Sequence, residues 1–296
     1  MRLFVGGTVP LAAGARFDLP PAAAAHVKVR RLQPGALLRL FDGDSGFEWP
    51  AEVLAIGRSA VRAGIAAGVS PLPAAAAELP LAATLAFAMP ANERVDALVE
   101  KASELGAAAL VPLMSERSVL RLEGDRAERR RAHWQGVAAA ACEQCGRARV
   151  PVVHGVQPLQ TWLRQLGPLS PAVPPPAPPE AAASSHGAAL RCLLSTDAAA
   201  PPLPALWPRP QPPRPQAPSH QEAAVALTAW PTGVVFLSGP EGGFGAGEVQ
   251  AARAAGFVAA SLGTRTLRAD TAPLAALAWL AVALAGAAAG RGSPGS

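Results

Sequence analysis

The sequence predicts an α/β protein with a parallel sheet, preceded by a small β-rich domain. From residue 81 onward, short apolar runs alternate with helix-like segments, which is the pattern of a parallel sheet with helical crossovers. Runs such as Val234–Leu237 are uncharged and rich in β-branched and aromatic residues, as expected of strands buried on both faces. Residues 1–75 instead carry short strand candidates separated by turn signals.

The domain boundary is predicted in a connector rich in proline and alanine, residues 71–80. This gives a first domain of residues 1–75 and a second domain of residues 76–296. Two further proline-rich stretches, 168–189 and 198–225, have a low-complexity composition, so we expect them to be insertions that decorate the second domain.

Composition restricts the partner and the compartment. The net charge of +5 and the isoelectric point of about 10.0 suit a polyanionic partner. Three cysteines, an odd number in 296 residues, argue against a disulfide framework and indicate a reducing, cytoplasmic compartment. Residues 1–15 make a poor signal peptide, because Gly6, Gly7 and Pro10 interrupt the apolar run. The uncharged stretch 272–290 is mostly alanine, so we expect a core or subunit-interface helix and no membrane association.

The first domain is expected to fold from short strands joined by tight turns. The strand candidates are 4–5, 37–41 and 52–56, and the turn signals are Pro34-Gly35 and Asp42–Gly46. Asp42-x-Asp44 also occurs in calcium loops, but no glutamate closes the loop at the required distance, so we expect a hairpin turn.

Residues 26–32 form the basic stretch of this domain. Lys28, Arg30 and Arg31 are candidates for contacts with RNA phosphates. The alternative is a solvated helix face or strand, and the sequence alone leaves both open.

The second domain is predicted to alternate strands and helices. The expected elements are strand 81–88, helix 92–105, strand 108–111, helix 124–141, strand 150–153, helix 159–166, strand 190–195, strand 234–237, helix 246–255, strand 257–262 and a final helix that begins after Asp270 and Thr271. In helix 92–105, apolar residues at helical spacing form one buried stripe, and Arg94 falls on the opposite, charged face.

Helix 124–141 runs into Cys142-Glu143-Gln144-Cys145-Gly146-Arg147. A Cys-x-x-Cys pair can hold zinc, but there is no second pair and Cys192 lies in an expected strand, so we expect no metal. Arg147 could bind an RNA phosphate or the target base. The alternative is that Gly146 ends the helix in a left-handed turn and that Arg147 pairs locally.

Two glycine-containing loops near the carboxyl end organise the rest of the chain. Residues 237–244 and 262–272 each follow an apolar run and lead into a helix. Glycines let a backbone approach a ligand closely, and ligands bind at the carboxyl ends of strands in open α/β sheets, so the two loops predict one composite pocket. A tight turn between strand and helix is the alternative for the first loop. Neither a P-loop nor GxGxxG is present, which disfavours a nucleotide-phosphate site.

The second loop also carries two arginines. Arg265 and Arg268 lie three residues apart, beside Asp270. Such a pair next to a glycine-built pocket predicts recognition of an anion or a base, and a solvated loop charge is the alternative.

These motifs resemble the C-terminal signature of the SPOUT-class RNA methyltransferases, specifically the bacterial enzymes that methylate N3 of a uridine in small-subunit ribosomal RNA. The similarity rests on Gly239-Pro240-Glu241-Gly242-Gly243-Phe244, on Leu-Gly-x-Arg-x-Leu-Arg-x-acid-Thr-Ala at 262–272, on Lys-x-x-Glu-Leu-Gly at 101–106 and on Glu-Gln-x-Gly-Arg at 143–147. Asp270 stands where the family has glutamate.

The resemblance implies a SPOUT-type domain with a trefoil knot, a rare topology, preceded by a PUA-like β-barrel that helps to bind RNA. It implies S-adenosylmethionine as the cofactor, ribosomal small-subunit RNA or the assembled small subunit as the partner, and a homodimer through the knot region. The residues expected to bind the cofactor are Leu237, Ser238, Gly239, Pro240, Glu241, Gly242, Gly243, Leu262, Gly263, Leu267, Thr271 and Ala272. The residues expected to bind RNA are Lys28, Arg30, Arg31, Arg147 and Arg268.

Methylation at N3 requires that the uridine lose the proton on that nitrogen. The protein must therefore favour the anionic base by positioning it and by placing positive charge near its carbonyl oxygens. Our hypothesis gives this role to Arg268 or Arg265, with Glu241 or Asp270 as proton acceptor or orienter. The alternatives are a SPOUT methyltransferase that acts on another RNA position, such as a ribose 2′-hydroxyl, and a non-catalytic RNA-binding protein.

Overall fold

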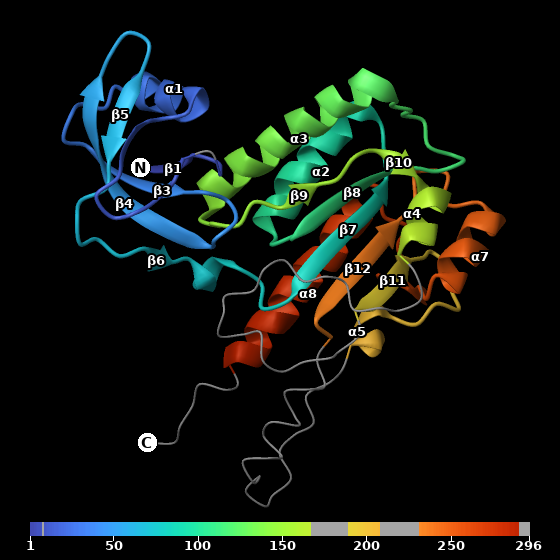
Figure 1. The fold of residues 1–296 in the computed structure, drawn as a ribbon. Coiled ribbons are helices and arrows are strands. Elements are labelled where there is room, and N and C mark those ends of the chain that lie inside the picture. Colours follow the sequence, from blue (N-terminus) through green and yellow to red (C-terminus); the bar gives the residue numbers. More distant parts are fainter. Residues whose placement is uncertain (8, 167–188, 208–230, 290–296) are drawn as a thin grey trace, which may run out of the picture. The chain divides into compact units, whose positions relative to one another are not determined.

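The structure is a computed structural model, and it describes residues 1–7, 9–166, 189–207 and 231–289 (Figure 1). Most of the two predicted proline-rich insertions lies outside the described residues. The chain divides into two compact units. The first unit contains Met1–Glu78 and Gly136–Pro151, and the second contains Leu79–Gln135 and the chain from Val152 onward. By its contacts, the segment 136–151 thus belongs to the first unit, whereas the sequence analysis assigned it to the second domain.

The first unit is built on a six-stranded sheet. Its elements are β1 (Arg2–Phe4), β2 (Arg16–Asp18), α1 (Pro21–Val29), β3 (Leu37–Phe41), β4 (Phe47–Ile56), β5 (Val61–Gly64), β6 (Leu72–Pro73) and the 3₁₀-helix η1 (Ala75–Ala77). The strand order is β1-β3-β4-β5-β2, with β6 paired to β4. All pairs are antiparallel except β1 with β3. Alternate residues of these strands point into one core, which includes Leu3, Leu40 and Val53.

One prediction for this unit is confirmed. Asp42 closes a hairpin turn between β3 and β4, because its Oδ1 accepts hydrogen bonds from the backbone N–H groups of Asp44 and Ser45, each at 2.9 Å. The basic stretch 26–32 begins in helix α1 and continues past its end at Val29, which is compatible with both a solvated face and phosphate contact.

The second unit contains a parallel sheet with helices on both faces. Its elements are β7 (Ala82–Ala88), α2 (Asn92–Glu104), β8 (Ala109–Met114), the first half of α3 (Gly124–Cys145), β9 (Val152–Val153), β10 (Gln157–Pro158), α4 (Leu159–Gln165), β11 (Leu190–Leu194), α5 (Leu203–Leu206), β12 (Gly233–Ser238), α7 (Ala246–Ala254), β13 (Val258–Ala260) and α8 (Thr271–Ala289). The strand order is β10-β8-β7-β12-β11-β13, with β9 paired to β8, and every pair is parallel. The predicted parallel α/β architecture is confirmed.

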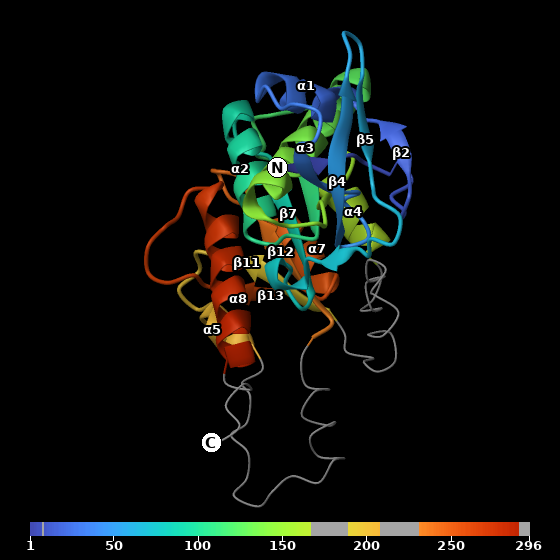
Figure 2. The ribbon, with the colours of Figure 1, turned by 90° about the vertical axis from the view of Figure 1, so that its left-hand side faces the viewer.

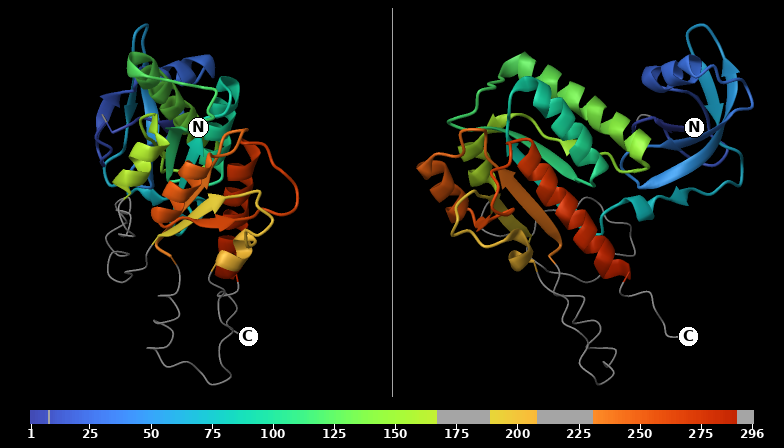
Figure 3. Two further views of the ribbon diagram at one scale, coloured as in Figure 1. Left: turned by 90° about the vertical axis from the view of Figure 1, so that its right-hand side faces the viewer. Right: turned by 180° about the vertical axis from the view of Figure 1, so that it is seen from behind.

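Helices cover this sheet from both sides, as Figures 2 and 3 show. Helices α4 and α7 lie on one face, where Trp162 and Phe257 pack in one core with Leu237 of β12. Helices α2 and α8 contact each other, and α8 contacts β7 and β12. Every residue of β12 is buried, which explains why this strand carries no charged residue. Within the described residues, no helix combines the length and the apolarity that crossing a membrane requires.

The topology gathers the loops of interest at one edge of the sheet. Because all strands are parallel, their carboxyl ends lie at the same end of the sheet, and we call this end the edge of the sheet. It is where the chain leaves β7, β8, β11, β12 and β13. The chain continues from β7 to β8 on one side and from β12 towards β13 on the other, so the loops after these two neighbouring strands diverge. Such a point is where open α/β sheets form their ligand crevice.

Candidate functional site

The first glycine loop follows β12 and contains a tight turn. The Gly243 N–H donates to the Pro240 carbonyl at 2.8 Å, and Gly243 has a φ of +65°. The turn that the sequence left open as an alternative is therefore present. It leaves Glu241, Gly242 and Gly243 exposed at its corner, while Leu237 and Ser238 remain buried at the end of β12. A turn of this kind presents backbone groups, rather than side chains, to a ligand.

Residues of the loop after β8 brace this turn. Glu248 is 2% exposed, and its two carboxylate oxygens accept the N–H groups of Glu116 and Gly245, both at 2.9 Å. Arg117 donates from Nη1 to the Gly242 carbonyl at 2.7 Å. A side chain at Gly245 would collide with the Glu116 carboxylate. The sequence analysis missed these contacts, although a glutamate three residues after a helix N-cap is a recognisable capping signal.

The second glycine loop connects β13 to α8. Gly263 has a φ of +112°, which an L-residue adopts only with strain. The Arg268 carbonyl accepts the N–H groups of Thr271 and Ala272 at 3.0 and 2.9 Å and so begins α8. Leu262 and Leu267 are half-buried.

The two arginines of this loop are available to a ligand. Arg265 and Arg268 are exposed, and their side chains make no hydrogen bond or ion pair with any residue that the structure describes. Positive charge without an internal partner, next to a glycine-built edge, suits recognition of an anionic group.

Arg94 joins the two loops. Its Nη1 lies 3.2 Å from Glu241 Oε1 in the first loop, and its Nε lies 3.9 Å from Asp270 Oδ2 at the end of the second. The structure therefore brings both predicted loops within reach of one side chain. The sequence analysis gave Arg94 no role, because its partners are more than a hundred residues away and no local pattern connects them.

The residues at this edge fit S-adenosylmethionine. Glycine permits close packing within the first loop, since a Cβ at Gly239 would lie 3.3 Å from the Phe244 ring and a Cβ at Gly242 would lie 3.4 Å from Arg117 Cδ. The loops offer backbone amides and carbonyls beside half-buried leucines, and no lysine that would grip a phosphate. Adenine and an amino-acid group can be held by such donors and acceptors.

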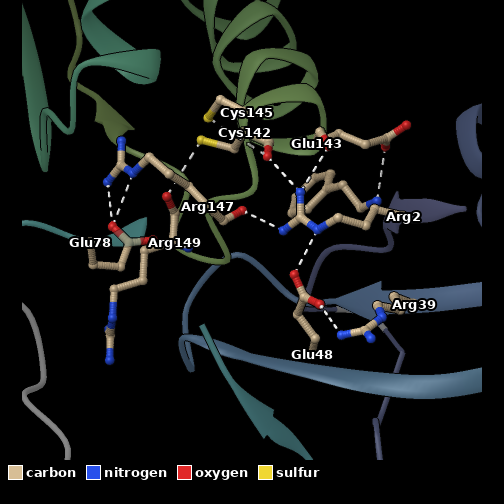
Figure 4. Close-up of polar contacts among 10 residues, drawn as sticks. Arg2, Arg39, Glu48, Glu78, Cys142, Glu143, Cys145, Arg147 and Arg149 are labelled. Carbon is tan, nitrogen blue, oxygen red and sulfur yellow. Dashed lines mark hydrogen bonds and ion pairs between the residues drawn. The ribbon is translucent and has the colours of Figure 1, made fainter. Parts of the chain in front are cut away.

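Arg147 lies elsewhere and is bound within the first unit (Figure 4). It is 3% exposed, and its Nε and Nη2 donate to Glu78 Oε2 at 2.9 and 2.8 Å. Gly146 has a φ of +95°, so the local alternative, a left-handed cap with Arg147 paired inside the protein, is the observed geometry. An RNA phosphate would have to compete with Glu78 for this guanidinium, and the role of Arg147 in RNA binding stays a prediction.

Arg2 completes this network, which Figure 4 shows in full. Its guanidinium donates to Glu48 at 2.6 Å and to the carbonyls of Cys142, Glu143 and Arg147 at 2.8 to 2.9 Å. A cation at the last carbonyls of α3 also compensates the negative end of the helix dipole. The Glu-Gln-x-Gly-Arg block thus serves to fasten the end of α3 within the first unit.

The remaining RNA-binding candidates lie at the end of α1. Arg30 and Arg31 are exposed, and Arg31 ends the helix with a φ of +53°. Lys28 Nζ donates to the Arg58 carbonyl at 2.9 Å. Their contacts with RNA stay predictions.

The described residues contain no group of three or more His, Cys, Asp or Glu that could hold a metal ion. Cys142, Cys145 and Cys192 form no disulfide bond among the described residues. A side-chain hydrogen bond with Cys145, together with burial, raises the pKa of the Cys142 thiol. A thiol with a raised pKa is a poor metal ligand and a poor nucleophile at neutral pH.

Comparison with known proteins identifies related sequences and structures. A family model described as an RNA methyltransferase domain matches residues 77–172 and 213–281, and one described as an RNA methyltransferase PUA domain matches residues 19–65. The chain is 30% identical over 253 residues to ribosomal RNA small subunit methyltransferase E of Synechocystis sp., with 85% of this chain and 67% of the relative covered. It is 28% identical over 200 residues to the Bacillus subtilis protein of the same name, with 68% and 65% covered. The chain thus spans about two thirds of the length of these relatives.

A solved structure shares the fold. The crystal structure of ribosomal RNA small subunit methyltransferase E from Neisseria gonorrhoeae bound to S-adenosyl methionine superposes with a TM-score of 0.71. The two chains are 30% identical, and the match covers 94% of this chain and 96% of the other. The α/β fold with a parallel sheet and the PUA-like character of the first unit are thereby confirmed.

Proposed function

Since the chain belongs to the family of ribosomal RNA small subunit methyltransferases E, we propose that it methylates N3 of a specific uridine in small-subunit ribosomal RNA. The observation that carries this proposal is the edge of the parallel sheet. There, two glycine loops meet through Arg94, and Arg265 and Arg268 are exposed and have no partner within the part of the chain that the structure describes. This combination offers a side-chain-poor cofactor site beside positive charge for a base.

The two loops would hold the cofactor. S-adenosylmethionine, when bound, supplies a methyl group activated by its sulfonium centre. The backbone at Gly239–Gly243 and at Leu262–Gly263 would bind its polar groups, and Leu267 and Ala272 would cover its apolar surface. Glu248 and Arg117 hold the first loop in shape, so little ordering is left to occur on binding.

The arginines would bind and polarise the base. A guanidinium near the uracil carbonyl oxygens stabilises the anion that remains when N3 loses its proton. Arg268 is the first candidate because its own carbonyl is anchored at the start of α8, while its side chain is exposed. Glu241 and Asp270 are the carboxylates available to accept or orient the proton, and both face Arg94.

The first unit would contribute to RNA binding. Arg30 and Arg31 are exposed cations at the carboxyl end of α1, and exposed cations contact phosphates readily. We propose that the first unit acts as the RNA-binding domain and the second unit as the catalytic domain, with ribosomal RNA or the assembled small subunit as the partner.

A second copy of the chain would complete the assembly, and the knot region would form the interface. A groove of about 480 Å³ between α2 and α8 is lined mostly by apolar residues, which include Leu98, Leu274 and Ala278, and also by the charged residues Lys101, Glu104 and Asp270. On α8, Val282 is 73% exposed. An apolar groove beside an exposed apolar helix position suits a self-complementary dimer contact. Leu274→Glu should therefore convert the dimer to a monomer in analytical ultracentrifugation.

Two further features belong to the proposal. The chain leaves β13 at the margin of the sheet and returns to the central strands β7 and β12 as α8, and we propose that it passes through a loop on this path and so forms a trefoil knot. Ribosomal RNA as substrate, together with three free thiols, supports a cytoplasmic location.

The decisive experiment compares ribosomal RNA from cells with and without the gene by mass mapping of methylated nucleosides. The proposal requires that 3-methyluridine disappear from the small-subunit RNA and return with the wild-type gene. Loss of a ribose-methylated nucleoside instead would establish the alternative reaction. No change, together with no uptake of S-adenosylmethionine in calorimetry, would leave an RNA-binding protein.

A further inference from the structure

We infer that Arg94 is a positioning residue. It contacts both Glu241 and Asp270 and thereby fixes the position of the two loops relative to each other. This inference rests on the proposed function, because it assigns a role within the same site. It concerns a residue that no local sequence pattern marks.

Three chain segments meet at the Arg94 guanidinium. Arg94 lies in the first turn of α2, just after β7, and its two partners follow β12 and β13. Nη1 faces Glu241 Oε1 at 3.2 Å, and Nε faces Asp270 Oδ2 at 3.9 Å. The second oxygen of Asp270 accepts the Thr271 hydroxyl at 3.3 Å, so the contact extends to the start of α8.

The geometry requires arginine. Two separate nitrogens of one planar group serve two carboxylates on different loops. Lysine presents a single compact charge at the end of a flexible stem and cannot hold two partners at fixed angles in the same way. A lysine at position 94 would therefore retain the charge and lose part of the alignment.

Arg94 also balances charge at the site. Without it, Glu241 and Asp270 would leave two uncompensated negative charges at the edge where an RNA polyanion and an anionic base must arrive. With Arg94 in place, Arg265 and Arg268 remain free to face the substrate, since neither has an internal partner among the described residues.

Stability and activity should respond differently to its loss. The Arg94, Glu241 and Asp270 side chains are 36%, 39% and 27% exposed, and ion pairs at such positions stabilise a fold weakly. A small displacement of a site, by contrast, costs a large factor in rate. A positioning role therefore predicts lost activity with retained stability.

The test compares Arg94→Met and Arg94→Lys in the full-length protein with a matched control, Arg131→Met. Arg131 is also partly exposed and pairs with one carboxylate, Glu128, but lies on α3 away from the loops. We expect Arg94→Met to lower the single-turnover rate at saturating RNA by about 100-fold and to raise the Kd for S-adenosylmethionine by about tenfold. The rate and the cofactor Kd of Arg94→Lys should lie between those of the wild type and Arg94→Met. The melting temperatures of both variants should equal that of the wild type, and Arg131→Met should match the wild type in all three quantities.

A double variant separates positioning from direct RNA contact. If Arg94 acts through Glu241, Arg94→Met combined with Glu241→Gln should slow the reaction by less than the product of the two single effects, because each change removes the same contact. A rise in the KM for RNA alone, with an unchanged rate and cofactor Kd, would overturn the inference. An inactive wild type would refute the proposed function instead, and cofactor binding would still report on Arg94.

Discussion

The arginines discussed in the first unit are paired inside the protein, whereas those of the second glycine loop in the second unit are exposed. In the first unit, Arg2 and Arg147 donate hydrogen bonds to carboxylates, and Arg2 also donates to a backbone carbonyl. In the second unit, Arg265 and Arg268 are exposed and have no partner among the described residues. In the sequence, Arg147 and Arg268 both fall in motifs that suggest RNA contact. The difference teaches that an arginine motif indicates either a structural clamp or a ligand site, and that burial with a carboxylate decides between them.

The largest expected effect is on catalysis at Arg268. Removing a donor that stabilises charge in the transition state typically costs about 100- to 1,000-fold in rate. Arg268→Ala should therefore lose most of the single-turnover methylation rate, with near-normal affinity for S-adenosylmethionine in calorimetry and an unchanged melting temperature. Arg253→Ala, an exposed arginine on α7, is the matched control. A normal rate in Arg268→Ala would remove this residue from the mechanism.

In the first unit, loss of Arg147 should lower the stability of the fold. Arg147→Met leaves the carboxylate of Glu78 without its partner in a largely buried site, where the two side chains are only 4% and 13% exposed. Such a change typically costs about 3–5 kcal/mol in the free energy of unfolding, measured by urea denaturation. Arg39→Met is the control, because its side chain is 54% exposed and its pair with Glu48 is worth about 0–1 kcal/mol. If Arg147→Met instead weakened RNA binding and left the free energy of unfolding unchanged, Arg147 would be a ligand-binding arginine like Arg268.

A smaller effect should follow at the brace of the first loop. Glu248→Gln keeps the size of the side chain but leaves one of two backbone N–H groups, on Glu116 or Gly245, without an acceptor. Losing a hydrogen bond to a charged group should cost about 1.5–3 kcal/mol of stability, seen as a lower melting temperature. The Kd for S-adenosylmethionine should rise as the loop loosens. Glu123→Gln, an exposed change before α3, should alter neither quantity.

The smallest effect concerns the thiols. Burial raises the pKa of Cys192 from 9.0 to about 12, so at pH 8 the folded protein keeps this thiol protonated. Cys142 is expected to behave alike, since its pKa is also raised. Both should resist a thiol-reactive dye at pH 8 and react fully in urea. Because the folded pKa lies above the unfolded one, the contribution of Cys192 to stability is complete below about pH 9 and is lost as the pH rises towards 12. Rapid labelling of both thiols in the native protein would contradict this.

The elements themselves were predictable because their signals are local. The pattern of β-branched and apolar residues located β3 and β12, and the stripe of helical spacing located α2. The two glycine loops were found in the same way, since glycine clusters after strands are visible in a few residues of sequence.

The partners of charged residues were not predictable. Arg191 lies in the expected strand β11, yet it is 5% exposed and donates to the carbonyls of Ala255 and Leu166 at the ends of α7 and α4. Arg94 was assigned to a wet helix face and instead connects two loops. In both cases the partners are distant in sequence, so no window of neighbouring residues contains the information.

By itself, the sequence determined the alternation of strands and helices, the two glycine loops and the family resemblance, because each depends on residue types close together along the chain. Only the tertiary structure decided which arginines pair with groups of the protein itself and which remain exposed to a ligand. The physical reason is that burial and pairing depend on elements that become neighbours only when the sheet assembles, and a guanidinium has the same sequence appearance in either environment.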